Sequence, residues 1–274
     1  MNLPPSLTSL HNPLVKQVRK LHQTKERHRQ GIFLLEGTHV LEAAAAARYP
    51  LKHLFYTTDW WQRHAALGLD LQGQADTVRE VAPPVLKSLA TTVHPDGVVA
   101  TAARRQLSVP DDLPPIVPSL GLAVERLQDP GNLGTIIRTI AAAGADSFWL
   151  TDDSVDADHP KVLRASAGQW FRSPLQTYPV LSAALSAAQA RATQAGQPLQ
   201  VVATTPTASA AYWALDLTRP TLFVLGNEGS GLSADVLASA THEVSIPLDK
   251  GVESLNVAIS AALFLYEACR QRQA

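Results

Sequence analysis

The chain has little of what builds covalent cross-links or sulfur-based metal sites. Its 274 residues include a single cysteine, Cys269, and a single methionine. One thiol excludes a disulfide within the chain and a metal site made of cysteines. Because Cys269 lies in an apolar C-terminal segment, we interpret it as a buried residue without a chemical role. The nine histidines show no metal-ligand spacing, so we expect no bound metal.

Long apolar runs are also missing. No run approaches the roughly 18 to 20 residues that a membrane helix needs. The first residues lack the basic and then apolar order of a secretion signal. We therefore expect a soluble, cytoplasmic protein that does not contact membranes. With 46% apolar residues over 274 positions, the chain can bury a large core and is long enough for two domains.

The net charge is close to zero, at −1, but the charges are unevenly distributed. The segment 1–31 contains one acid, Glu26, and six lysine and arginine residues. The six are Lys16, Arg19, Lys20, Lys25, Arg27 and Arg29. Such a segment is typical of a solvated helix face and equally of a surface that binds a phosphate backbone. Charge alone leaves both interpretations open.

A proline-rich stretch divides the chain. Four prolines lie between residues 110 and 118, and a segment of this kind can form neither a helix nor a central strand. We interpret 106–118 as a linker. It separates a basic arm at 1–30 and a first domain at 31–105 from a second domain at 119–274.

Apolar runs alternate with helical stretches in both domains. The first domain has predicted strands at Ile32–Leu35, Leu51–Tyr56, Thr77–Val81 and Val98–Ala102, with helices at His39–Ala47 and Pro84–Ala90. The second domain has predicted strands at Leu120–Val124, Phe148–Leu150, Leu199–Ala203 and Thr221–Leu225. This alternation predicts an α/β fold. The first domain is small, and the second is built on a mostly parallel sheet covered on both faces.

Three polar segments of the second domain could carry chemistry, since α/β folds bind ligands in the loops that follow their strands. The first segment follows the strand at Leu120–Val124, and in it Asn132 fits the N-cap of an apolar helix. Arg138 lies on the second turn of this helix, from which its side chain can reach back over the ~9 Å to the capping loop. An amphipathic helix with one solvated arginine is the alternative interpretation.

The second segment, Gly226–Gly231, has the order G-x-x-G-x-G, which is neither a dinucleotide-binding fingerprint nor a phosphate loop. Glu228 at its tip argues against a phosphate and suits a cation or a sugar hydroxyl, although an ordinary turn would look the same. The third segment runs from Ile246 into a helix predicted to begin near Ser254. Because this helix is apolar on all sides, we expect its first turn, with Ser254 and Asn256, to be buried.

Together the three segments resemble the ordered motifs of the SpoU (TrmH) branch of the SPOUT RNA methyltransferases. The segments are Asp129–Gly134 with Arg138, Gly226–Gly229 with Gly231, and Glu253–Val257. Their order, spacing and content match the family over about residues 116–271. In addition, Ser9–Lys16 and Phe33–Gly37 resemble parts of the L30e-like substrate-binding domain of the family's ribosomal-RNA members. The resemblance therefore covers nearly the whole chain.

The resemblance implies a deep trefoil knot in the second domain, which forms a pocket for S-adenosylmethionine. It implies cofactor contacts from Thr204, Gly226, Ile246 and Leu255. It implies a catalytic group made of Asn132, Arg138, Glu228, Ser254 and Asn256. It also implies a homodimer that pairs the knotted domains.

The reaction implied is methyl transfer to a ribose 2′-hydroxyl in RNA, with 23S-type ribosomal RNA as the preferred substrate. The family gives the role of base to the arginine found here as Arg138. A guanidinium does not normally release its proton in proteins, so we favour a role in holding the target phosphate. RNA contacts are expected from Lys16, Arg19, Lys20, Arg27 and Arg164. Arg164 begins a basic stretch shared with many members, and a salt-bridged surface arginine is its alternative interpretation.

Other functions stay open on the sequence alone. A tRNA 2′-O-methyltransferase has the same motifs, and a non-catalytic RNA-binding or ribosome assembly factor can keep the fold after losing its activity. A nucleotide-dependent oxidoreductase is disfavoured by the order of the glycines and by the lack of an acidic residue ending a second strand. The extra N-terminal domain favours structured ribosomal RNA over tRNA as the substrate.

Overall fold

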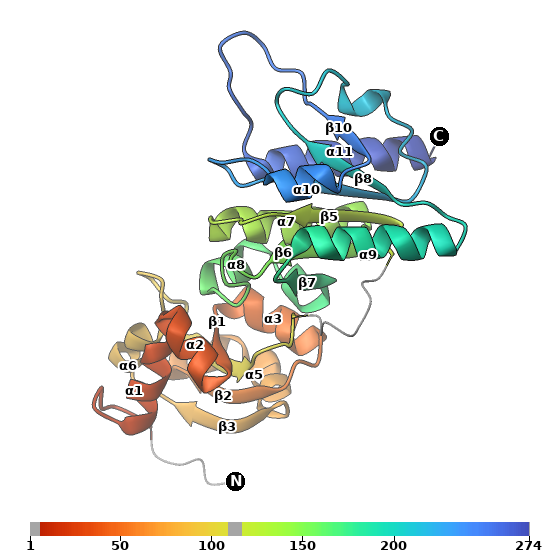
Figure 1. The fold of residues 1–274 in the computed structure, drawn as a ribbon. Coiled ribbons are helices and arrows are strands. Elements are labelled where there is room, and N and C mark those ends of the chain that lie inside the picture. The colour runs from red at the N-terminus through yellow and green to blue at the C-terminus, as the bar shows by residue number, and fades with distance from the viewer. Residues whose placement is uncertain (1–5, 109–116, 274) are drawn as a thin grey trace. The chain divides into compact units, whose positions relative to one another are not determined.

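The computed structural model describes residues 6–108 and 117–273, which form two compact units (Figure 1). Unit 1 contains Met1–Arg105 and Asp156–Arg172, and unit 2 contains Gln106–Val155 and Ser173–Ala274. Each unit has its own sheet. Most of the predicted linker at 106–118 lies outside the described residues.

Unit 1 is built on a four-stranded mixed sheet in the order β1-β4-β2-β3. Strand β4 is antiparallel to both of its neighbours, and β2 and β3 are parallel to each other. The strands are β1 (Ile32–Glu36), β2 (Leu51–Tyr56), β3 (Ala75–Glu80) and β4 (Val98–Ala103). All four agree with the predicted strands to within two residues at each end.

The residues predicted to form a basic arm fold as the first helices of unit 1. Asn12 caps α1, since its Oδ1 accepts a hydrogen bond from Leu14 N at 2.9 Å. Val15, Val18 and Leu21 recur at every third position and are completely buried. This spacing places apolar side chains on one face and leaves the lysines on the other. The helices of unit 1 are α1 (Pro13–Arg19), η1 (Lys20–His22), α2 (Thr24–Gln30), α3 (Thr38–Ala46), α4 (Thr58–Arg63), α5 (Ala65–Gln72), α6 (Pro83–Leu89), α8 (Pro160–Ala165) and η2 (Gln169–Arg172).

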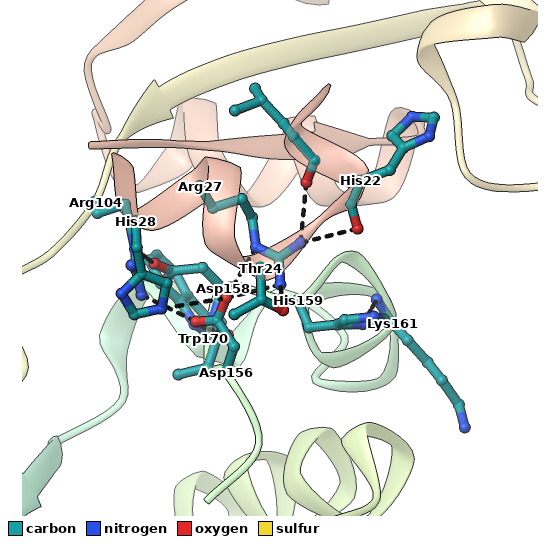
Figure 2. Close-up of polar contacts among 12 residues, drawn as sticks. His22, Thr24, Arg27, His28, Arg104, Asp156, Asp158, His159, Lys161 and Trp170 are labelled. Carbon is teal, nitrogen blue, oxygen red and sulfur yellow. Dashed lines mark hydrogen bonds and ion pairs between the residues drawn. The ribbon is translucent and has the colours of Figure 1, made fainter. Parts of the chain in front are cut away.

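A network of four charged side chains joins α2, the residue after β4 and the segment 156–158 (Figure 2). Arg27 is completely buried, and its Nη2 lies 2.7 Å from Asp156 Oδ2. Arg104 Nη2 donates to the other oxygen of Asp156 at 2.9 Å, and Arg104 Nε pairs with Asp158. The remaining hydrogen bonds of Arg27 go to Leu21 O at 2.9 Å, His22 O at 3.3 Å and Thr24 Oγ1 at 2.9 Å.

This network explains why the segment 156–172 belongs to unit 1. A buried charge without a partner costs several kcal/mol, so Arg27 can lie inside the protein only where carboxylates satisfy it. Asp156 and Asp158 are those carboxylates, and they bring with them α8, which packs against α3 and β1. Burial raises the pKa of the Asp158 carboxyl although Arg104 opposes the shift.

Unit 2 is built on a six-stranded sheet in which every neighbouring pair is parallel, in the order β10-β8-β9-β5-β6-β7. This confirms the predicted parallel sheet. The strands are β5 (Leu120–Val124), β6 (Ser147–Thr151), β7 (Leu175–Tyr178), β8 (Gln200–Thr204), β9 (Thr221–Leu225) and β10 (His242–Val244). The direction of the strand order reverses between β9 and β5, and open α/β sheets bind ligands at such a position.

Helices cover both faces of this sheet. Helices α7 (Pro130–Ala143) and α11 (Val257–Gln273) pack together on one face, where Phe264 stacks on Phe223 with ring centroids 5.3 Å apart. Helices α9 (Leu181–Gln194) and α10 (Ala234–Ala238) lie on the other face (Figure 1). A short 3-10 turn, η3 (Tyr212–Ala214), follows β8. Cys269 on α11 is half-buried, and its thiol donates to Ala143 O at 3.3 Å.

Two helix starts differ from the prediction. Asn132 was predicted to cap α7, but the cap is Asp129, since Pro130 takes the first helical position and Asp129 Oδ1 accepts from Asn132 N at 2.9 Å. Helix α11 was predicted to begin near Ser254, but it begins at Val257. Its first amides are capped by Asn256 Oδ1, which accepts from Ala258 N at 2.9 Å. Residues 251–256 are exposed and not buried as predicted.

The buried network makes a prediction about stability. Arg27→Met should lower the free energy of unfolding of unit 1 by about 3 kcal/mol, because Asp156 stays buried and loses one of its two arginine partners. Arg29→Met is the matched control, because Arg29 is 61% exposed and forms a surface ion pair with Glu26, and it should cost less than about 1 kcal/mol. Urea denaturation followed by circular dichroism measures both. Equal losses in the two variants would contradict the structural role of Arg27.

Candidate active site

A cavity of about 580 Å³ lies at the carboxyl ends of β8, β9 and β10 in unit 2. The loops that follow these three strands form its walls. All four residues predicted to contact a cofactor line it: Thr204, Gly226, Ile246 and Leu255. Glu228, Ser254 and Asn256 from the predicted catalytic group line it as well, whereas Asn132 and Arg138 do not.

The loop after β9 is held in a closed conformation by its own backbone. Asn227 and Gly231 exchange two hydrogen bonds, Asn227 N to Gly231 O at 3.1 Å and Gly231 N to Asn227 O at 3.0 Å. Gly226 has to be glycine, since a Cβ there would lie 2.2 Å from the backbone carbon of Gly231. The closed loop leaves Glu228 exposed at its tip.

Asn227 organises this loop, and the sequence analysis did not identify it. Its Oδ1 accepts from Gly229 N at 2.9 Å and from Ser230 N at 3.1 Å. Its Nδ2 donates to Arg126 O at 2.7 Å, in the loop after β5. The available signal was an asparagine at the entrance of a glycine-rich turn, because asparagine side chains often bond the backbone two residues ahead.

The three predicted polar segments meet in a continuous series of hydrogen bonds. Asn256 Nδ2 donates to Asn132 Oδ1 at 2.9 Å. Asn132 Nδ2 in turn donates to Glu228 Oε1 at 3.1 Å. Because Asp129 caps α7, the side-chain amide of Asn132 is available for these two bonds. The side-chain oxygen of Asn256 caps α11, and its nitrogen donates to Asn132. One amide group therefore both caps the helix and holds Asn132.

Arg138 is placed differently from the expectation. It lies on α7 with an exposed side chain, and no hydrogen bond or ion pair joins its guanidinium to another residue in the part of the chain that the structure describes. The predicted reach back to the capping loop is therefore not formed. Within this chain, Arg138 matches the alternative of a solvated arginine on an amphipathic helix.

The residues predicted to contact RNA fall into two groups. Lys16, Arg19 and Lys20 are exposed on α1 and η1. Arg27 is completely buried and ion-paired, so its guanidinium is not accessible to RNA. Arg164 on α8 lies 3.0 Å from the Glu36 carboxylate, which matches the salt-bridged alternative.

The apolar run that begins at Phe33 ends in a charged residue, Glu36, which has a structural role. Its buried carboxylate accepts from Thr91 N and Thr92 N, each at 2.9 Å, and from both threonine hydroxyls. Burial alone would raise the pKa of the Glu36 carboxyl, but these hydrogen bonds outweigh burial and hold the pKa below its ordinary value. Arg164 donates to the same carboxylate oxygen as Thr91, so Glu36 joins β1 to the segment 91–92 and to α8.

Comparison with known proteins identifies the family. Residues 119–266 match the SpoU rRNA Methylase family, and residues 12–100 match the MRM3-like substrate binding domain. The chain belongs to the SpoU rRNA Methylase family. This confirms the family indicated by the three motif segments and the presence of a substrate-binding region before them.

Similar proteins span nearly the whole length of this SpoU family member. A protein of Synechocystis named as an uncharacterized tRNA/rRNA methyltransferase is 48% identical, over 98% of this chain and 95% of its own. The Bacillus subtilis 23S rRNA (guanosine(2553)-2′-O)-methyltransferase RlmP is 30% identical, over 95% of this chain and 97% of its own. The crystal structure of the SpoU methyltransferase AviRb from Streptomyces viridochromogenes in complex with AdoMet has a TM-score of 0.84 and 30% identity, and covers 96% of this chain and 99% of that chain. Within the described parts of this chain, no helix has the length and apolarity to cross a membrane.

The walls of the cavity fit S-adenosylmethionine. Ile246, Leu248 and Leu255 offer an apolar surface for an adenine ring, and Thr204, Glu228 and Ser254 are among the polar residues of the wall. The hydroxyl of Thr205, also on the wall, is buried without a hydrogen-bond partner among the described residues and can serve a polar group of a ligand. The volume lies within the roughly 300–1,000 Å³ of small-molecule pockets.

The closed loop predicts a sharp difference between two glycines. Gly226→Ala should weaken S-adenosylmethionine binding by about fivefold to a hundredfold, because its Cβ would displace the backbone of Gly231 and such overpacking costs about 1–3 kcal/mol. Gly229→Ala should bind almost as the wild type, because the nearest atom to its Cβ would be Asn227 Oδ1 at 3.5 Å. Isothermal titration calorimetry measures both affinities. Similar affinities for the two variants would show that the closed loop does not form the cofactor site.

Proposed function

We propose that this chain transfers a methyl group from S-adenosylmethionine to a ribose 2′-hydroxyl of ribosomal RNA. The observation that carries the proposal is the series Asn256–Asn132–Glu228, which takes one residue from each motif segment and has two of its three members on the cavity wall. A hydroxyl group bound beside the cavity would meet a carboxylate whose position is fixed by an amide. That arrangement suits a sugar hydroxyl better than a phosphate.

Bound S-adenosylmethionine would supply an electrophilic methyl group. The protein then has to align a weakly nucleophilic hydroxyl and let its proton leave. In this proposal Glu228 orients the ribose, Asn132 holds the Glu228 carboxylate, and Asn256 holds Asn132. Ser254 and Asn256 shape the wall between the two substrates. Thr204, Gly226, Ile246 and Leu255 hold the cofactor, and the family's trefoil knot stays a prediction for the loops around it.

Arg138 is proposed to hold the phosphate of the target nucleotide. Its guanidinium is exposed and has no partner in the described structure, as expected of a group whose partner arrives with the substrate. A base role would require it to give up a proton, which guanidinium groups do not normally do in proteins. The hydroxyl proton would leave through the phosphate or through water.

Ribosomal RNA is the proposed substrate class, and the cytoplasm the proposed location. The support is the substrate-binding region matched at 12–100 and the relatives named for 23S rRNA, which include one for a uridine and others for a guanosine. A tRNA substrate and a non-catalytic assembly role are the remaining alternatives. The second is disfavoured because the hydrogen-bonded series at the cavity is intact.

Mapping of 2′-O-methyl groups in total RNA tests the proposal. Cells that lack the gene should lose the methyl group at one ribosomal position, and the wild-type gene should restore it. Arg138→Ala should not restore it, because removal of a preorganised charged group typically costs about 10²–10³ in rate. Arg219→Ala is the matched control, because Arg219 is exposed before β9 and does not line the cavity, and it should restore methylation.

Purified protein separates the alternatives. Arg138→Ala should keep its affinity for S-adenosylmethionine, since Arg138 does not line the cavity. An unchanged methylation map that covers both rRNA and tRNA would favour the non-catalytic factor. Loss of a tRNA position alone would identify a tRNA enzyme.

We also propose a homodimer that uses α11. Ile259 and Tyr266 on this helix are apolar but 53% and 52% exposed. Large exposed apolar side chains on one element mark interaction surfaces. Ile259→Lys should convert the dimer to a monomer, as measured by light scattering after gel filtration. Val180→Lys, at a position 56% exposed before α9, should leave the dimer intact. A monomeric wild type would contradict the proposal.

A further inference from the structure

We propose that a basic hollow on unit 1 holds the phosphate backbone of the RNA substrate, an inference that rests on the proposed function. The hollow has a volume of about 370 Å³ and is formed by α1, η1 and the end of α2. Three of its lining residues are the cations Lys16, Lys20 and Arg29. The polar side chains of His11, Gln17 and Gln30 complete most of the lining, which includes no acid.

The fold fixes where these side chains point. Val15 and Val18 bury one face of α1 in the core of unit 1, so Lys16 and Lys20, four positions apart, lie together on the opposite, exposed face. The end of α2 is fastened to α1 because Gln30 Nε2 donates to Gln17 O at 3.4 Å. The cations therefore extend from helices that pack on the core of unit 1.

The charges of the hollow are largely uncompensated. Glu26 is the acid beside it, and that carboxylate is already engaged by Arg29 at 2.5 Å and by Gln30 at 3.2 Å. Lys16 and Lys20 form no ion pair with any residue that the structure describes, although Glu26 is close enough to Lys20 for a weaker electrostatic interaction. Two of the arginines predicted to contact RNA are instead engaged by carboxylates, Arg27 by Asp156 and Arg164 by Glu36.

A phosphodiester backbone is the partner that this chemistry recognises. The chain as a whole carries a net charge of −1, so a concentration of free positive charge in one hollow is a local feature and not a consequence of composition. Lysines contact phosphates as point charges, and amides and imidazoles beside them can bond sugar hydroxyls. Arg19 extends the exposed basic surface of α1 beyond the hollow.

The salt dependence of RNA binding tests the hollow. The probe is a short fluorescein-labelled RNA hairpin, followed by fluorescence anisotropy at several salt concentrations without S-adenosylmethionine. Lys16→Gln with Lys20→Gln should weaken binding roughly tenfold at ~0.1 M salt and reduce the slope of log K against log salt by about 2, one for each phosphate that a lysine no longer neutralises. Lys16→Arg with Lys20→Arg keeps both charges and should bind nearly as the wild type.

The matched control removes the same charge elsewhere in unit 1. Arg48→Gln with Lys52→Gln also removes two positive charges and therefore has the same net charge as the first variant. Both residues lie beside an acid, Arg48 at 3.7 Å from Asp70 and Lys52 at 3.4 Å from Asp76. This variant should bind RNA nearly as the wild type. An equal loss in this control, or an unchanged slope for Lys16→Gln with Lys20→Gln, would overturn the inference.

Methyl transfer to total ribosomal RNA by the wild type, measured in parallel, keeps the two proposals apart. If the wild type methylates RNA but the variant with Lys16→Gln and Lys20→Gln binds RNA with an unchanged slope, the hollow does not bind the RNA backbone. The proposed methyltransferase function is then unaffected. If the wild type binds the cofactor but methylates no RNA, the proposed function fails. Thermal unfolding at the wild-type temperature shows that the variants are folded.

Discussion

The parallel direction of all six strands in unit 2 is the constraint on which the candidate site depends. In a parallel sheet every strand delivers its following loop to the same edge. Asn132 follows β5, Glu228 follows β9 and Asn256 follows β10, so residues 96 and 124 positions apart in sequence come within hydrogen-bond distance. With an antiparallel pair in this sheet, one of these loops would emerge at the opposite edge. The topology of the sheet therefore brings the three loops together, and the side chains then form the hydrogen bonds between them.

The chemistry of the amide group explains why asparagine occupies two positions of the series. Asn132 has to accept from Asn256 and donate to Glu228, which requires an oxygen and a nitrogen on one side chain. Asn256 has to accept from the first amides of α11 and donate to Asn132. An aspartate at either position would lack the donor and would place a second negative charge near Glu228. Helix capping and the arrangement of the site are therefore coupled, since Asp129 caps α7 and leaves the Asn132 side chain free for the series.

The sequence predicted the strands, and which polar segments meet at the sheet edge, better than it predicted local geometry such as the starts of helices. Apolar runs such as Leu120–Val124 and Thr221–Leu225 agree with their strands because burial on both faces leaves a continuous apolar signal. The helix starts were less predictable, because Asp129, Asn132, Ser254 and Asn256 are all good caps by residue type and only the positions of Pro130 and Val257 decide between them. The place of 156–172 could not be predicted, since it depends on ion pairs between residues more than fifty positions apart.

In the basic segment of unit 1, an arginine is buried and the lysines are exposed. The difference follows from how many hydrogen bonds each side chain can form when it is buried. Arg27 presents donors in several directions and finds an acceptor for each, among them Asp156 and the carbonyl of Leu21. A lysine at this position would offer a single compact ammonium to the same acceptors and would leave some of them unpaired. Lys16 and Lys20 are instead exposed, where the ammonium group keeps its hydration. A basic segment that looks uniform in sequence therefore contains two kinds of cation: the buried, ion-paired Arg27, and exposed side chains such as Lys16 and Lys20.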